Sequence, residues 1–298
     1  LYNETDRKNM ETTSSLYIDF LSKCKTEREC VKEIIRQAED AGYINIETAI
    51  KENKKISCGD KVYSVCMKKA VALFRIGKTP IEQGMNILGA HIDSPRLDIK
   101  QNPLFEDGEL AFLDTHYYGG VKKYQWVALP MAMHGVIVKK DGTVVNVTIG
   151  EDEEDPVLYI TDLLIHLAGQ QMAKKASEVV EGEKLDILIG SRPLADLPDD
   201  KKKEAVKENV LRILNEKYGV EEEDFLSAEL EIVPAGKARD CGLDRSMIAG
   251  YGQDDRVCAY TSLLALLEMK APKRTSCCLL VDKEEIGSVG ATGMQSRF

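Results

Sequence analysis

The 298-residue sequence predicts an α/β protein in which a β-rich middle region separates two segments of mixed helix and strand. Three observations carry this prediction. Apolar residues recur at helical spacing in residues 27–41 and form a short run at 87–90. Apolar and polar residues alternate on both sides of Asp141-Gly142. After Gly236 the sequence returns to an apolar helix followed by an apolar strand.

The first segment begins with a predicted helix over residues 27–41. Gly42 ends a run of apolar side chains at helical spacing, which are Cys30, Val31, Ile34, Ile35 and Ala38. Residues 61–77 predict strand and turn structure, and residues 87–90 predict a short buried strand that ends at His91. Pro95 cannot donate a ladder hydrogen bond, so this strand is expected to stop before it.

The middle region combines a hairpin with helices and further strands. Asp141-Gly142 between two alternating runs is a strong hairpin signal, and residues 151–156 form an acidic loop. Residues 160–176 and 199–219 predict helices, whereas residues 184–190 and 227–236 predict strands. Five apolar residues share one face of the second helix, namely Ala205, Val206, Val210, Ile213 and Leu214.

The last segment repeats the α/β pattern of the first. A candidate strand precedes Asp254, an apolar helix covers residues 258–269, and residues 276–285 predict a strand. The apolar run of that strand ends in Glu284 and Glu285, and Gly287 follows directly. A pair of adjacent carboxylates at a strand end is either a solvated loop or a functional site.

Composition excludes some functions and indicates a compartment. The 40 Lys and Arg residues against 50 Asp and Glu give a formal charge of −10, which argues against nucleic acid as the main partner. No apolar stretch approaches the roughly 20 residues that span a bilayer, and the N-terminus lacks the apolar core of a signal peptide. The eight cysteines show no CxxC spacing, which favours packing thiols in a reducing, cytoplasmic setting.

Three clusters of acidic or imidazole side chains follow the predicted strands: His91 with Asp93, Asp254 with Asp255, and Glu284 with Glu285. Because ligands of open α/β sheets bind beyond the carboxyl ends of the strands, we expect all three clusters to face one crevice. Imidazole and carboxylate groups bind zinc, and one carboxylate can bridge two ions about 3.5–4 Å apart. One glutamate could then bind metal while its neighbour moves a proton, and Asp93 could orient the His91 ring.

Each cluster taken alone has a simpler interpretation. An H-x-D triplet is commonly a packed or surface histidine, and an exposed Glu-Glu pair is commonly just solvated. An Asp-Asp pair before a helix is most often an N-cap, a role that Asp255 would serve well. The combination, with each acid directly after a strand and near a glycine, favours a metallohydrolase.

Several segments resemble the aspartyl aminopeptidase family of dinuclear zinc aminopeptidases. The segments GAHIDSPRLDIKQNP, YGQDDRVCAYTSLLALLE and DKEEIGSVGATGMQS resemble the catalytic part of the family, and HYYGGVKKYQW and ITDLLIHLAGQ resemble its inserted domain. The resemblance implies a three-layer zinc-exopeptidase catalytic domain with an inserted β-rich dimerisation domain. The implied boundaries are 1–100 for the first catalytic part, 101–235 for the insertion and 236–298 for the continued catalytic part.

The resemblance also implies roles for individual residues. His91 is expected to bind one zinc ion, Asp254 to bridge both ions and Glu285 to bind the other. Glu284 is then the general base and Asp93 orients His91. The implied cofactor is zinc, two ions per subunit, with cobalt or manganese as possible substitutes.

His166 matches a substrate-binding histidine that, in the family, reaches the neighbouring subunit's active site. The alternative for His166 is an ordinary helix histidine near Asp162. His116 and His134 have no matching role, and packing or surface positions are expected for both. The family also assembles as dimers into a dodecamer, and its two remaining ligands, an aspartate and a histidine, belong to a C-terminal part beyond Phe298.

The sequence therefore predicts a cytoplasmic, zinc-dependent aminopeptidase that removes single N-terminal residues from peptides, without nucleic-acid or membrane partners. Without an initiator Met before Leu1, the sequence is expected to be part of a longer gene product. One alternative is another dizinc hydrolase, such as a carboxypeptidase or deacylase. The other is a non-catalytic assembly protein built on a broken metallopeptidase, against which the four intact residues His91, Asp254, Glu284 and Glu285 argue.

Overall fold

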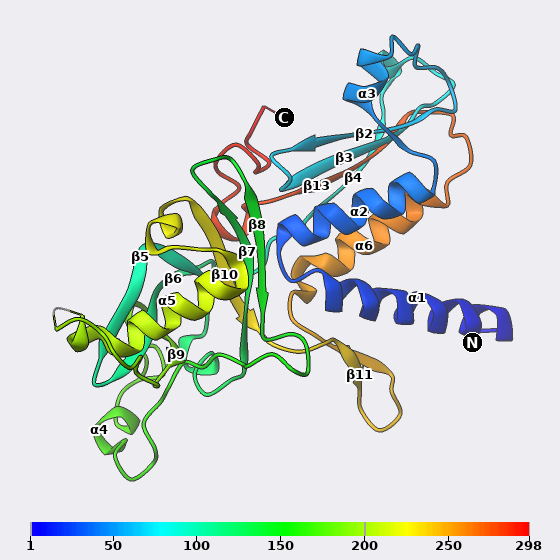
Figure 1. Cartoon of the computed structure of the whole chain (residues 1–298). Helices are drawn as coiled ribbons and strands as arrows, with labels where there is room; N and C mark the ends of the chain where they lie inside the picture. The colour runs from blue at the N-terminus through cyan, green and yellow to red at the C-terminus, as the bar shows by residue number, and fades with distance from the viewer. Residues whose placement is uncertain (1, 200, 298) are drawn as a thin grey trace. The chain divides into compact units, whose positions relative to one another are not determined.

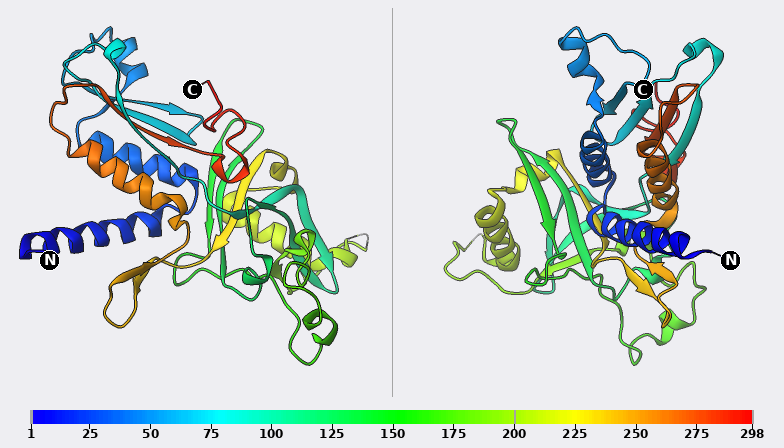
Figure 2. Two further views of the ribbon diagram at one scale, coloured as in Figure 1. Left: turned by 180° about the vertical axis from the view of Figure 1, so that it is seen from behind. Right: turned by 90° about the vertical axis from the view of Figure 1, so that its right-hand side faces the viewer.

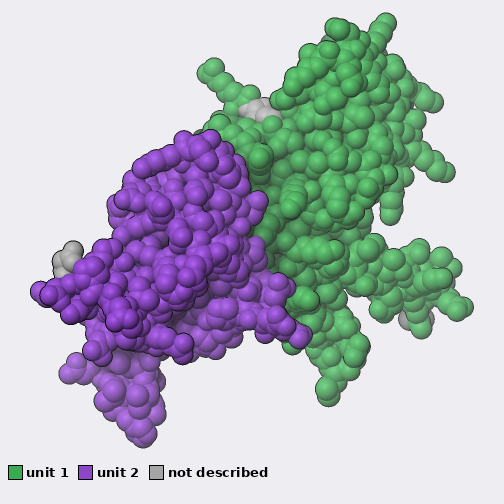
Figure 3. Space-filling view, viewed as in Figure 1, with its two compact units in different colours: residues 1–94, 237–298 green, residues 95–236 purple. Residues whose placement is uncertain are grey.

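A computed structural model describes residues 2–199 and 201–297 of the chain. The chain forms two compact units, coloured separately in Figure 3: unit 1 comprises residues 1–94 and 237–298, and unit 2 comprises residues 95–236. Both units combine helices with sheets, which confirms the predicted mixed α/β fold. No helix of the described ranges has both the length and the apolar character needed to cross a bilayer.

Unit 1 is built on a five-stranded mixed sheet. The strand order is β1 (Ile44–Asn45), β2 (Lys61–Cys66), β3 (Ala70–Arg75), β13 (Ser276–Val281) and β4 (Asn86–His91). Strand β13 runs antiparallel to β3 and parallel to β4. Helices α2 (Glu27–Asp40) and α6 (Gln253–Leu267) lie along the same face of this sheet (Figures 1 and 2). Parallel pairing of β4 and β13 brings their carboxyl ends to one edge.

The remaining elements of unit 1 are short or lie outside the main sheet. Helix α1 (Glu4–Lys23) precedes α2, and α3 (Ile46–Lys51) follows β1. Strands β11 (Arg239–Cys241) and β12 (Met247–Ala249) form a separate two-stranded antiparallel sheet. The sequence analysis assigned no helix to the residues of α1, although Asn3 and Asp6 form a capping box at its start.

Local sequence explains why α2 begins and ends where it does. Thr26 accepts a hydrogen bond from the Glu29 amide, and the Glu29 carboxylate accepts one from the Thr26 amide, so both groups of a capping box are satisfied. Gly42 follows the helix with a φ of +85°, a conformation that favours glycine. The predicted helix over residues 27–41 is confirmed to within one residue.

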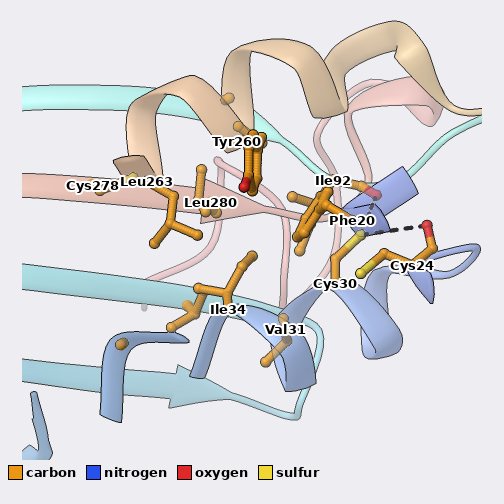
Figure 4. Packing of buried hydrophobic residues seen from close by; sticks show 14 of the residues in the cluster. Phe20, Cys24, Cys30, Val31, Ile34, Ile92, Tyr260, Leu263, Cys278 and Leu280 are labelled. Atoms are coloured by element: carbon orange, nitrogen blue, oxygen red, sulfur yellow. Dashed lines mark hydrogen bonds between the residues drawn. The ribbon is translucent and has the colours of Figure 1, made fainter. Parts of the chain in front are cut away.

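The core of unit 1 joins the helices to the sheet. Figure 4 shows Phe20, Ile34, Leu263 and Leu280 converging between α2, α6 and the strands. The rings of Phe20 and Tyr260 pack with centroids 4.9 Å apart. Full burial of one such side chain stabilises the fold by about 1.5–3 kcal/mol, so this cluster holds the start of α6 against the strand ends.

Strand β4 forms as predicted, but its first four residues are exposed and only Ala90 and His91 are buried. The side chains of Ile87 and Leu88 are 58% and 42% exposed. The apolar run was interpreted as a buried strand, whereas β4 is the last strand in the order of its sheet and has β13 on one side only. Four consecutive apolar residues indicate a strand but do not reveal whether it lies at an edge.

Unit 2 contains a six-stranded antiparallel sheet. Its order is β8 (Val144–Ile149), β7 (Met131–Val138), β10 (Ala228–Pro234), β5 (Arg96–Asp107), β6 (Leu110–Tyr118) and β9 (Ile187–Gly190). Strands β7 and β8 form the hairpin predicted around Asp141-Gly142, and Gly142 has a φ of +85°. The long β5–β6 hairpin was not predicted, although Asp107-Gly108 lies at its turn, because apolar and polar residues do not alternate cleanly on both sides of this dipeptide.

Helix α5 (Ala205–Tyr218) packs on this sheet and confirms the helix predicted over 199–219. Val206 and Val210 are buried, as expected for the apolar face. Ile213, which was placed on the same face, is exposed instead. Its helical spacing places it on the same face as Val206 and Val210, so the spacing alone did not show that this position stays uncovered.

The helix predicted over residues 160–176 is mostly wrong. Only α4 (Gly169–Met172) is helical, and residues 161–168 form an irregular segment. Four apolar side chains of this segment are exposed, namely Leu163, Leu164, Ile165 and Leu167. Helices in proteins are stabilised mainly by burying an apolar face, and unit 2 offers these side chains no such burial.

Candidate metal centre

Two adjacent strand ends of unit 1 carry most of the predicted site. His91 is the last residue of β4 and lies opposite Val281, the last residue of β13. The chain then turns after β13 into a short 3₁₀ helix that begins with Glu284 and Glu285. Parallel strands in register therefore bring the imidazole and both glutamates to the same edge of the sheet, as the sequence predicted.

Asp254 reaches the site by a different route from the one predicted. The strand before it, β12, belongs to the separate two-stranded sheet, so Asp254 does not follow a third strand of the main sheet. It lies instead in the first turn of α6, where the backbone of Asp254 and Asp255 is not helical. The Oδ1 atom of Asp254 still lies 3.3 Å from Nε2 of His91.

Asp93 is the buried centre of this arrangement. Its carboxylate accepts hydrogen bonds from the backbone amides of Glu284 at 3.3 Å and Glu285 at 3.2 Å. Its carbonyl oxygen lies 3.0 Å, and its Oδ1 atom 3.3 Å, from Nδ1 of His91. One buried carboxylate thus links the histidine ring to the backbone of the glutamate loop, and Nε2 of the ring is left facing the other acids.

The turn that presents the glutamates depends on two left-handed residues. Lys283 has a φ of +71° and Gly287 a φ of +91°. The Lys283 carbonyl accepts a hydrogen bond from the Ser288 amide at 2.7 Å, which closes the turn. Gly287 explains the glycine that follows the Glu-Glu pair in the sequence, since a left-handed conformation there costs glycine little.

The acids around His91 favour a positive charge at its ring. Burial is the largest single influence and opposes charge, but the hydrogen bonds and the charge of Asp93 outweigh it and raise the pKa of His91 to about 9. Burial also raises the pKa of Glu285, which is half-buried. The negative charge of the surrounding carboxylates, which stabilises a proton on the imidazole, would also stabilise a bound divalent cation.

The donor set fits zinc. His91, Glu284 and Glu285 offer ligand atoms that all lie within 4.8 Å of one another. One imidazole nitrogen with carboxylate oxygens is a common zinc environment. The side chains of Asp254 and Glu284 are 86% and 54% exposed, so both carboxylates are accessible from solvent.

Asp255 stands at the position predicted for an N-cap. Helix α6 is assigned from Gln253, but the backbone of Asp254 and Asp255 is not helical, so the regular part of the helix follows Asp255. Asp255 forms a hydrogen bond with the Cys258 thiol that raises the pKa of that thiol. Its capping of the helix backbone stays a prediction.

The other three histidines are all in unit 2. His166 is exposed within a turn of the irregular segment at residues 161–168. His116 is exposed, with Nδ1 3.1 Å from Oε1 of Glu183, and His134 is buried, with Nε2 3.1 Å from Oε1 of Glu151. His116 therefore occupies a surface position and His134 a packing position, as expected.

Ser94 also supports the site, although no role was predicted for it. Its hydroxyl donates a hydrogen bond to the Asp254 carbonyl at 2.9 Å, which ties the turn after β4 to the start of α6. The only signal in the sequence was a small polar residue between Asp93 and Pro95.

Histidine and carboxylate side chains at neighbouring strand ends of a mixed sheet are the arrangement expected of a metallohydrolase. Residues 20–298 match the family model described as "Aminopeptidase I zinc metalloprotease (M18)". The chain belongs to this M18 family, which confirms the family predicted from the sequence.

Curated relatives agree with the family model. The chain is 61% identical over 297 residues to the "Probable M18 family aminopeptidase 1" of Clostridium acetobutylicum, and the match covers 100% of the chain and 63% of the relative. It is 47% identical over 298 residues to the protein of the same description from Thermotoga maritima, again covering 63% of the relative. The chain therefore spans about 63% of the length of these relatives.

Solved structures show the same fold. The M18 aminopeptidase of Thermotoga maritima superimposes with a TM-score of 0.92 at 47% identity, covering 99% of this chain and 63% of that one. Aminopeptidase I of Clostridium acetobutylicum gives a TM-score of 0.86 at 62% identity, covering 94% and 61%. The mApe1 dodecamer of S. cerevisiae, at 21% identity and a TM-score of 0.70 over 96% and 64% of the chains, is similar in fold.

Proposed function

We propose that the protein containing this chain is a zinc-dependent aminopeptidase that removes single N-terminal residues from peptides. The observation that carries the proposal is the convergence of His91, Asp254, Glu284 and Glu285 around the buried carboxylate of Asp93. Membership of a zinc metalloprotease family supports the same conclusion.

Within this proposal three residues hold zinc. His91 would hold one ion through Nε2, Glu285 would hold the second ion, and Asp254 would contribute its carboxylate to both. Zinc, when bound, supplies Lewis-acid polarisation of the peptide carbonyl and lowers the pKa of water toward neutrality. Cobalt or manganese could occupy the same carboxylate-rich set.

Glu284 is the proposed general base. Its backbone is held by Asp93, while its side chain is exposed and free to meet a substrate. The carboxylate would accept a proton from water as the water oxygen bonds to the peptide carbonyl carbon. It would then donate this proton to the peptide nitrogen as the carbonyl re-forms and the C–N bond breaks, so that the amine leaves uncharged. General acid–base transfer of this kind contributes about 10²–10⁴-fold to the rate.

Asp93 and His91 position the reacting groups. Hydrogen bonding at Nδ1 directs Nε2 of His91 toward Asp254 and Glu284. This fixes which ring nitrogen is available as a ligand. The buried Asp93 carboxylate also restrains both glutamate amides, so the base and the ligand keep a constant separation.

The roles of the two units belong to the same proposal. We assign residues 1–100 and 236–298 to a catalytic domain of three layers, in which further structure covers the exposed side of β4. Residues 101–235 are assigned to an inserted dimerisation domain. The exposed apolar side chains of residues 163–167 support a surface of that domain that is covered by another subunit.

Assembly and location complete the proposal. Homodimers would associate into a dodecamer, and His166 would contribute to substrate binding in a neighbouring subunit. All eight cysteines are free thiols, which supports a cytoplasmic location. The proposed substrates are peptides with a free N-terminus.

The test uses the full-length gene product and short peptides with free or acetylated N-termini. Release of the first residue from free peptides should stop on addition of a chelator and return with zinc. Acetylated peptides should not be cleaved, which separates an aminopeptidase from a deacylase or carboxypeptidase. Absence of any chelator-sensitive hydrolysis from the zinc-loaded, full-length protein would contradict the proposal.

A further inference from the structure

We propose that Arg256 is a positioning residue that sets the distance between the ligand turn at residues 91–94 and Asp254. This inference rests on the proposed function and deepens it. Arg256 lies two residues after Asp254 and is only 1% exposed, although it carries a permanent charge. Such a residue needs a structural reason to be buried.

The hydrogen bonds of Arg256 connect separate segments of unit 1. Its Nε atom donates to the Ile92 carbonyl at 3.2 Å, and its Nη2 atom donates to the Lys25 carbonyl at 2.9 Å. Ile92 stands between His91 and Asp93 in the chain. The guanidinium therefore fixes the peptide that lies between the proposed zinc ligand and the carboxylate that orients it.

A hydrogen bond from Ser94 provides a second connection between residues 91–94 and the start of α6. The Ser94 hydroxyl donates to the Asp254 carbonyl at 2.9 Å. Residues 91–94 are thus tied to the start of α6 at two points, once through Arg256 and once through Ser94. The two ties bracket Asp93 and hold Nε2 of His91 3.3 Å from Oδ1 of Asp254.

Direct ion pairing does not account for the burial of Arg256. Among the described residues no carboxylate forms an ion pair with its guanidinium, although the charge of buried Glu27 favours it, and Nη1 has no hydrogen-bond partner. The ring of Tyr251 lies 5.3 Å from the guanidinium carbon. A buried guanidinium without a directly paired carboxylate costs free energy that an apolar side chain would not. The planar guanidinium can, however, donate hydrogen bonds to two carbonyl oxygens at fixed angles.

The neighbouring backbone leaves room for this group. A Cβ atom added to Gly252 would lie 1.9 Å from Nη1 of Arg256 and 3.2 Å from Oγ of Ser94. Gly252 also has a φ of +79°. The substitution Gly252→Ala would therefore displace the guanidinium without removing it, which provides a second, independent perturbation.

The test measures zinc affinity in the full-length gene product, together with the visible absorption spectrum of the cobalt-substituted protein. Arg256→Met is expected to weaken zinc binding about 10–100-fold, the usual effect of removing a group that orients metal ligands. Gly252→Ala should act in the same direction. Arg256→Lys keeps the charge but offers one ammonium in place of the fork, so it should restore the affinity only in part.

Leu263→Ala is the matched control. Leu263 is fully buried in the same helix, and the core cluster to which it belongs contains none of the proposed metal ligands. It should lower the melting temperature at least as much as Arg256→Met while leaving the zinc affinity and the cobalt spectrum unchanged. All affinities are measured well below the melting temperature of each variant.

The outcomes separate this inference from the proposed function. A wild-type protein that binds zinc and cleaves peptides, with Arg256→Met and Gly252→Ala no weaker in zinc affinity than Leu263→Ala, would overturn the positioning role alone. A wild-type protein that binds no zinc would overturn the proposed function, and the positioning role with it. A loss specific to Arg256→Met and Gly252→Ala, with an altered cobalt spectrum, supports the inference.

Discussion

Helix α6 and the segment at residues 160–176 look alike in sequence but differ in structure. Each is rich in leucine, and each carries a predicted site residue, Asp254 in the first and His166 in the second. Helix α6 buries Leu263 and Leu266 against the core of unit 1, whereas Leu163 and Leu164 are exposed. The comparison shows that an apolar run becomes a helix when the fold offers it a surface, and that a site residue is fixed only when its support is buried.

The largest effect is expected at the site residues that rest on the buried core of unit 1. Glu284→Gln keeps the size and the backbone anchor of Glu284 but removes the proton acceptor. It should lower kcat/KM for peptide cleavage by about 10²–10⁴-fold, with zinc content unchanged. Steady-state kinetics and metal analysis of the same samples provide the measurement.

His166→Ala is the corresponding substitution in the exposed segment at residues 161–168. It should leave zinc content unchanged and reduce kcat/KM by less than Glu284→Gln. An equal loss in both variants would mean that the exposed segment is as essential to catalysis as the proposed base.

The next effect concerns stability. Leu263→Ala removes a fully buried side chain from α6 and should reduce the free energy of unfolding by about 2–5 kcal/mol. Urea denaturation at fixed protein concentration, followed by circular dichroism, measures the change. A loss below the range expected for a buried leucine would show that the core between α6 and the sheet is loosely packed.

A smaller effect is expected at Asp93. Asp93→Asn retains the shape but weakens the two hydrogen bonds from the glutamate amides and the interaction with His91. Zinc affinity should fall about 10–100-fold, measured by competition with a chelator of known affinity. Unchanged affinity would argue that the loop and the ring keep their positions without this carboxylate.

The smallest effect belongs to the exposed segment. Leu164→Ser should change the free energy of unfolding by no more than about 0.5 kcal/mol, as is usual for surface positions. The measurement is made on the subunit under conditions where it is dissociated. Strong destabilisation of a dissociated subunit would show that residues 161–168 are buried in solution.

Much of the fold followed from local patterns. The helical spacing of α2, the alternation around Asp141-Gly142 and the apolar strand β13 were all identified correctly. The β5–β6 hairpin was missed even though its strands are consecutive, because apolar residues do not alternate cleanly beside Asp107-Gly108. The exposed positions of Ile87 and Leu88 depend on which strands become neighbours. The partner of β4 is β13, which is far away in the chain, so periodicity carries no information about this pairing.

Some residues of the candidate site could be predicted from the sequence, and others could be found only in the structure. His91, Asp93, Glu284 and Glu285 could be selected from the sequence because ligand-type residues directly follow apolar runs. The origin of Asp254 in a helix, and the roles of Ser94 and the Arg256 guanidinium, could not be predicted. They depend on contacts between residues more than a hundred positions apart.

By itself, the sequence determined the element types with strong periodicity, the helix caps at Thr26 and Gly42, and the chemistry of the ligand residues. These properties arise from interactions within a few residues, which local side-chain types specify. Only the tertiary structure decided that residues 161–168 remain irregular, that β4 lies at an edge, and that Asp93 joins the ring to the glutamate loop. Burial and long-range hydrogen bonds decide such features, and both exist only once distant segments have packed together.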